Sequence, residues 1–133
     1  TATYDGSIIV YSNVVGEIKT AEANKILISK DLCRVALYIK ELMDKYNLEV
    51  GIAFQAVGPS LTFYALSLSH HRIYTFMELF TIEIPYKVNM LLHFLHHLDD
   101  IYFLSKLYNE KCIISMNSTI FLRAETMSFS FLN

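Results

Sequence analysis

The sequence predicts an α+β fold in which two helices pack on one face of a largely antiparallel sheet. The chain has 133 residues, of which 53% are hydrophobic and 18% charged, enough for one hydrophobic core. Two segments, 25–42 and 81–98, carry the same apolar pattern at a constant offset of 56 positions. The stretch between them is rich in β-branched and aromatic residues, which is typical of strands. We therefore expect a single domain over 1–133 with an internal repeat.

The repeat predicts a strand-then-helix unit that is used twice. Its matching apolar residues are Ile26, Ile28, Leu32, Val35, Ala36, Ile39 and Leu42 in the first unit, and Ile82, Ile84, Val88, Leu91, Leu92, Leu95 and Leu98 in the second. The helical positions recur at intervals of three and four, so we expect them to face the sheet. The predicted β-α-β-β-β repeats cover 25–80 and 81–133, after an N-terminal β ribbon and connector over 1–24.

The N-terminal ribbon consists of short β segments and is followed by the strand and helix of the first unit. Residues 8–11 and 14–18 are predicted as β segments around a turn at 12–13, and 25–28 as a brief strand. Ser29 is a good N-cap for the helix that follows, and Asp31 would lie in its first turn, where negative charge is favoured. Asn47 can end this helix in the left-handed conformation.

The remaining elements are predicted from turn residues and composition. Turns at Gly58-Pro59 and at 69–71 divide residues 49–85 into three or four antiparallel strands. Pro85 suits the first turn of a second helix that runs to about Leu98, and Asp99-Asp100 would mark its exit because acidic residues are unfavourable at a helix C-terminus. Strands are then expected at 101–108, 111–116 and 119–132.

Charge and cysteine content narrow the class of protein. The net charge of -2 argues against a strongly basic nucleic-acid binder. Cys33 and Cys112 lack metal-site spacing and lie in apolar contexts, so we expect reduced core thiols and an intracellular, nuclear or virion-associated protein. The uncharged run 50–71 contains turn residues and is predicted as a hairpin rather than a membrane span, and no signal peptide is visible.

The chemical constellations favour a non-enzymatic protein. His93, His97 and Asp100 have a spacing that places ligands on one helical face, but no HExxH pattern accompanies them, so we expect surface or interface histidines and no metal. His70-His71 lie near two serines without a GxSxG elbow, and no glycine-rich phosphate loop occurs. No cofactor or small-molecule substrate is predicted, and the aromatic residues of the strands are interpreted as core.

Two stretches carry a resemblance to a known family. They are FTIEIPYKVNMLLHFLHH, residues 80–97, and EKCIISMNSTIFLRAETMSFSFLN, residues 110–133. With the repeated strand-helix order, they resemble a domain of the DNA sliding clamps, the proliferating-cell-nuclear-antigen family. The resemblance implies a processivity or scaffold domain that acts by ring assembly, as a homo- or hetero-oligomer, on duplex DNA and with replication or repair proteins. The DNA-facing residues that it implies are Lys30, Arg34, Lys45, Lys87, His93 and His97.

A second class of function fits the same features. A small self-associating structural protein, such as a viral matrix or assembly protein, would also be apolar, nearly neutral and without a catalytic site. The strand-helix-strand order is loosely similar to that of rhabdovirus matrix proteins. This alternative implies a nucleoprotein or a membrane in a virion as partner, and assembly through the pairing of edge strands.

Overall fold

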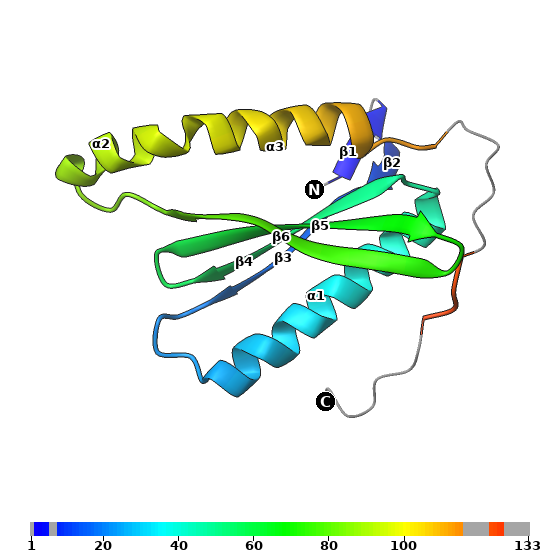
Figure 1. Ribbon diagram of the computed structural model, residues 1–133, viewed down its shortest axis with the longest axis horizontal. Helices are drawn as coiled ribbons and strands as arrows, with labels where there is room; N and C mark the ends of the chain where they lie inside the picture. Colours follow the sequence, from blue (N-terminus) through cyan, green and yellow to red (C-terminus); the bar gives the residue numbers. More distant parts are fainter. Residues whose placement is uncertain (1, 6–7, 116–122, 127–133) are drawn as a thin grey trace.

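A four-stranded mixed sheet lies at the centre of the computed structural model, which describes residues 2–5, 8–115 and 123–126 (Figure 1). Its strands are β3 (Val14–Lys19), β4 (Val50–Val57), β5 (Ser60–His70) and β6 (Ile73–Glu83), in the order β3-β4-β5-β6. The β3–β4 pair is parallel and the other two pairs are antiparallel. The α+β class and the strands and turns predicted over 49–85 are therefore confirmed.

Helix α1 (Lys25–Tyr46) crosses over between the parallel strands β3 and β4. It begins earlier than predicted, because Asn24 is the N-cap and its side-chain oxygen accepts a hydrogen bond from the Ile26 N–H at 2.8 Å. The predicted strand 25–28 is therefore wrong, and Ser29 lies inside the helix. A short apolar run fits both the period of a strand and that of a helix, and Ile28 continues the helical spacing of the residues after it. Asn47 ends the helix in the left-handed conformation, as predicted.

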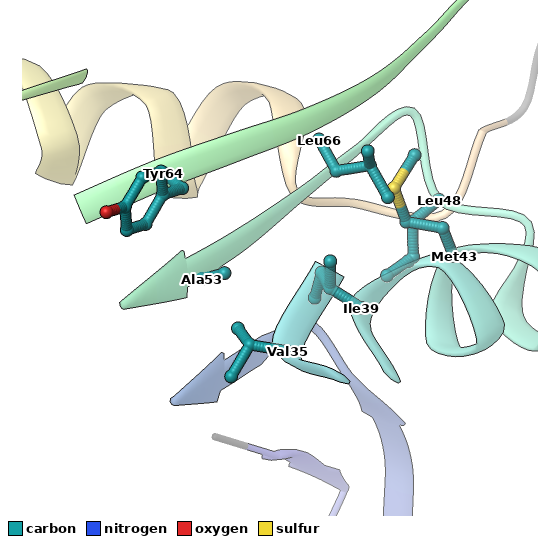
Figure 2. Packing of buried hydrophobic residues seen from close by; sticks show 7 residues of the cluster. All are labelled: Val35, Ile39, Met43, Leu48, Ala53, Tyr64 and Leu66. Carbon is teal, nitrogen blue, oxygen red and sulfur yellow. The ribbon is translucent and has the colours of Figure 1, made fainter. Parts of the chain in front are cut away.

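The main core lies between α1 and the sheet. Figure 2 shows α1 residues Val35, Ile39 and Met43 beside Ala53 of β4 and Tyr64 of β5. These α1 positions are the ones that the helical period predicts to face the sheet. The Tyr64 ring stacks on Phe76 of β6 at 5.0 Å between centroids, which extends the same layer across the sheet.

The opposite face of the sheet is also apolar. Ile52, Ala65 and Ile82, whose side chains alternate with those of the core under α1, are buried as well. Phe54, Phe63 and Phe80 form a ladder across β4, β5 and β6 on this face, with centroid distances of 6.4 and 5.2 Å. Both faces of the sheet therefore have to be shielded from water by other elements of the fold.

The second cover is a long helical segment after β6. It consists of the 3-10 turn η1 (Val88–Met90), α2 (Leu91–Phe94), the 3-10 turn η2 (Leu95–His97) and α3 (Leu98–Lys111). Figure 1 shows α2 and α3 on the side of the strands opposite α1. This corrects the predicted placement of both helices on one face, and the apolar character of both sheet faces is the physical reason.

The helical segment also corrects the prediction for residues beyond 98. Residues 101–108 are helical rather than a strand, and Asp99-Asp100 lie in the first turn of α3, where the helix dipole favours them. Of the predicted strand 111–116, Lys111 still belongs to α3 and Ile114 forms an isolated bridge with Leu48. Of the predicted strand 119–132, residues 123–126 are not in a strand, and the rest lies outside the described residues. The second unit therefore lacks the β-β-β part of the repeat in the part of the chain that the structure describes.

The N-terminal elements differ from the predicted hairpin. β2 (Ile8–Ser12) pairs antiparallel with β1 (Ala2–Asp5) in a separate two-stranded sheet, whereas β3 joins the central sheet. Between them Asn13 is buried, and its Nδ2 donates a hydrogen bond to the carbonyl of Cys112 at 3.0 Å. This bond connects the β2–β3 junction to the end of α3.

The uncharged run 50–71 forms β4 and β5, as the hairpin prediction requires. Among the helices in the described part of the chain, none has the length and apolar character needed to cross a membrane.

Candidate interaction surface

The helical segment from η1 to α3 has an inner side that packs loosely. Its half-buried residues include a row at intervals of three and four, and Asp100 and Leu107 lie beside this row; the row consists of Met90, Phe94, His97, Ile101, Leu104 and Tyr108. None of the residues from 88 to 111 is buried, in contrast to α1, which buries four. The segment is therefore held against the molecule by one partly covered face.

The outer side of the same segment is apolar too. Leu91, Leu95, Leu98 and Tyr102 form one row, and Leu92 and Phe103 belong to the next row; all six are between 49% and 71% exposed. We call these six residues the outer stripe. A helix that is apolar on both sides is typical of one that is covered on both sides.

The position of the four leucines corrects a specific prediction. Leu91, Leu92, Leu95 and Leu98 were expected to face the sheet, since they match the core positions of α1 in the repeat. In the structure they face outward, because the inner positions are taken by Phe94, Ile101 and their neighbours. The continuing intervals of three and four at Ile101, Leu104 and Tyr108 were the signal for this second face.

The outer stripe is large for an exposed surface. At about 200 Å² per large side chain, the exposed fractions amount to about 700 Å². The largest apolar patch on a typical monomer is about 300–600 Å², and a standard protein–protein interface buries about 800 Å² on each partner. The outer stripe alone therefore has the dimensions of one side of an interface.

The predicted DNA-facing residues lie on two sides of the molecule. Lys30, Arg34 and Lys45 belong to α1, Lys87 precedes η1, and His93 and His97 lie in α2 and η2. Because the sheet separates α1 from α2 and α3, the structure does not bring the two groups together (Figure 1).

Several of these cations have intramolecular contacts. Arg34 bonds to the buried Asp31 at 2.9 Å, and Asp31 also pairs with Lys19 at 3.0 Å. Nζ of Lys45 and of Lys87 lies over the ring of the neighbouring tyrosine, at 5.0 and 5.5 Å from its centroid. These contacts orient the cations along the protein surface.

The histidine constellation is partly assembled. His97 Nδ1 lies 3.3 Å from Asp100 Oδ2, and the rings of His93 and His96 stack with their centroids 6.5 Å apart. Within the described ranges no group of three or more His, Cys, Asp or Glu side chains is placed to hold a metal ion.

A second polar cluster joins three distant parts of the chain. Asp44 on α1 accepts hydrogen bonds from Lys40 and Arg123, both at 2.8 Å, and from the Tyr74 hydroxyl of β6. Burial alone would raise the pKa of Asp44, but the three hydrogen bonds together lower it below its usual value. Burial, reinforced by the bond to Asp44, raises the pKa of Tyr74 to about 12. With three donors on one carboxylate, this cluster is a structural junction rather than a reactive site.

Comparisons with protein-family models, curated proteins and solved structures find no match. On the surface of the described residues, the outer stripe is an apolar feature that the fold itself leaves uncovered.

Proposed function

We propose that this chain is a non-enzymatic assembly domain that works by binding further copies of itself. The observation that carries the proposal is the outer stripe, an apolar surface of interface size on a helix that packs only loosely on its own molecule. Covering this surface would remove about 700 Å² of apolar area from water, which favours association.

Self-association is common to both functions that the sequence suggests. A ring-forming scaffold and a viral assembly protein each need copies that bind to one another, in a nucleus or in a virion. The two differ in what the assembly does with DNA. Encirclement of a duplex needs cations gathered on one side, and the candidate residues are divided between α1 and the segment from Lys87 to η2. Figure 1 shows α1 and α2 on opposite sides of the sheet. We therefore favour assembly without encirclement.

The test is the molar mass in solution, measured by light scattering after size-exclusion chromatography. Between about 1 and 100 µM we expect a mass at least twice the 15.3 kDa of the chain, because interfaces of about this size have dissociation constants from the micromolar to the picomolar range. A mass of one chain at every concentration would contradict the proposal.

The same measurement with duplex DNA separates the two functions. We expect that the protein and the duplex DNA do not elute together at low or physiological salt. A closed ring of fixed low order that retains DNA at low salt and loses it steeply as salt rises would instead favour the sliding-clamp-like function.

A further inference from the structure

On the outer side of the helical segment, the intervals between exposed residues are the same from the N-terminal end as from the C-terminal end. The first row, Leu91, Leu95, Leu98 and Tyr102, has intervals of four, three and four. The second row, Leu92, His96, Asp99 and Phe103, has the same intervals, and its members are all exposed. Both rows are centred near residue 97. A two-fold axis near residue 97 would therefore bring each row of one copy against the same row of a second copy, which runs in the opposite direction.

The chemistry of the residues matches this symmetry. In an antiparallel pair of helices from two copies, Leu95 meets Leu98 and Leu91 meets Tyr102, so apolar residues face apolar residues in the first row. In the second row Leu92 meets Phe103, and His96 meets Asp99, which pairs a base with an acid. Apolar contacts thus lie at both ends of the second row, with the polar pair between them.

A parallel pair has none of this complementarity. In register, it would place the like-charged Asp99 residues of both copies near each other and align the two helix dipoles. The antiparallel arrangement opposes the dipoles and gives an isologous interface, in which each copy uses the same surface.

We infer that the partner of the outer stripe is a second copy of this chain, bound through an antiparallel pair of α2–α3 segments about a two-fold axis near His97. The inference rests on the proposed function, since it names the surface and the geometry of the self-association. The about 700 Å² that each copy contributes is close to the about 800 Å² per partner of a standard interface.

Disulfide trapping measures the direction of the helices. In a Cys33→Ser background, which removes the exposed native thiol, the two copies of residue 91 would be about 17 Å apart along an antiparallel pair. Disulfides need Cα atoms about 4.4–6.8 Å apart. Leu91→Cys should therefore not form a dimer by itself, whereas a mixture of Leu91→Cys and Tyr102→Cys should. Ile73→Cys in the β5–β6 hairpin, whose exposed fraction lies between those of Leu91 and Tyr102, is the control and should not cross-link.

Charge substitutions test the same contact without a covalent bond. Leu95→Glu and Leu98→Lys should each weaken self-association by at least about tenfold. Mixing the two variants should restore it, because an antiparallel heterodimer places Glu only against Lys and leaves the second contact Leu against Leu. Ile73→Glu, with nearly the exposed fraction of Leu95, should have no effect. Circular dichroism of each variant establishes that it is folded.

The outcomes separate the inference from the proposed function. Rapid cross-linking of Leu91→Cys with itself, or a wild-type-like mass for Leu95→Glu, would overturn the inference and leave self-association standing. A monomeric wild-type chain at every concentration would overturn both.

Discussion

The Asp44 carboxylate on α1 accepts a hydrogen bond from the Arg123 guanidinium at 2.8 Å, across 79 positions of sequence. Arg123 also donates to the Asn47 side chain and to the carbonyl of Leu48, at 2.9 and 3.2 Å. Nζ of Lys40 bonds to the carbonyl of Ala124 at 2.6 Å. Segment 123–126 is thus fixed to the C-terminal half of α1 through polar contacts.

Replacing Asp44 by alanine should destabilise the fold. Two cations and a tyrosine hydroxyl would lose their shared acceptor, which we expect to cost about 1–3 kcal/mol of unfolding free energy. Urea denaturation measures this. Glu41→Ala, on the exposed side of the same helix, is the control and should change stability by no more than about 0.5 kcal/mol. Equal effects of the two substitutions would contradict a structural role for the cluster.

The lowered pKa of Asp44 predicts a specific acid sensitivity. A carboxylate whose pKa is lower in the folded state contributes fully above its unfolded pKa of about 4, and this contribution is lost as the pH falls through the folded pKa. The unfolding free energy of the wild type should therefore fall below pH about 4 more steeply than that of Asp44→Asn. Urea unfolding at a series of pH values provides both curves, and parallel curves would refute the prediction.

The start of α1 gives a clean test of the cap. Asn24→Ala should cost about 1 kcal/mol, because the Ile26 N–H loses its side-chain acceptor, whereas Asn24→Ser should be nearly neutral. Ser29→Ala should also be nearly neutral, since Ser29 lies inside the helix and its hydroxyl only bonds back to the carbonyl of Lys25. Thermal unfolding of the three variants and the wild type measures these differences in stability. A larger effect at Ser29 than at Asn24 would instead restore the helix start expected from the sequence.

The rate at which a reagent labels the Cys112 thiol measures how often the structure opens at the end of α3. Burial raises the pKa of Cys112 to about 12, whereas Cys33 is exposed. At mildly alkaline pH a thiol reagent should label Cys33 quickly and Cys112 only as the structure opens. Asn13→Ala should accelerate labelling of Cys112, because it removes the hydrogen bond to the Cys112 carbonyl. Asn109→Ala, whose side-chain amide bonds to the carbonyl of Ser105 in α3, is the control, and mass spectrometry identifies the labelled residue.

The sequence predicted the part of the fold in which local signals and burial agree. The spacing of Val35 and Ile39 identified the core face of α1, and Asn47 and Gly58-Pro59 marked real ends and turns. These signals are local, because a cap or a turn depends on the residues beside it.

The sequence could not decide how the elements are arranged in space. Strands β4 and β5 bury residues on both faces, so alternation did not show that α1 and α3 take opposite sides. Nor did it separate the inner from the outer side of 88–111, because Leu95 and Ile101 are equally apolar. The candidate surface is visible only once the structure shows which of these residues is already covered.

The contact between Gly16 and Phe54 gives the last prediction. The two residues are register partners on β3 and β4, and a Cβ added at Gly16 would lie 2.2 Å from the Phe54 ring. The ring thus occupies the space that a side chain at position 16 would need, and Gly16→Ala should cost about 1–3 kcal/mol of unfolding free energy.

A double-mutant cycle isolates this contact. In a Phe54→Ala background the added methyl group meets no ring, so Gly16→Ala should cost little there, and the coupling energy should reach at least about 1 kcal/mol. Ile18→Ala, an exposed position on the same strand and face, is the control and should stay within about 0.5 kcal/mol. Chemical denaturation of the four cycle members measures the coupling. Additive effects would show that Phe54 does not lie on Gly16, and the packing of the aromatic ladder at the β3 edge would have to be revised.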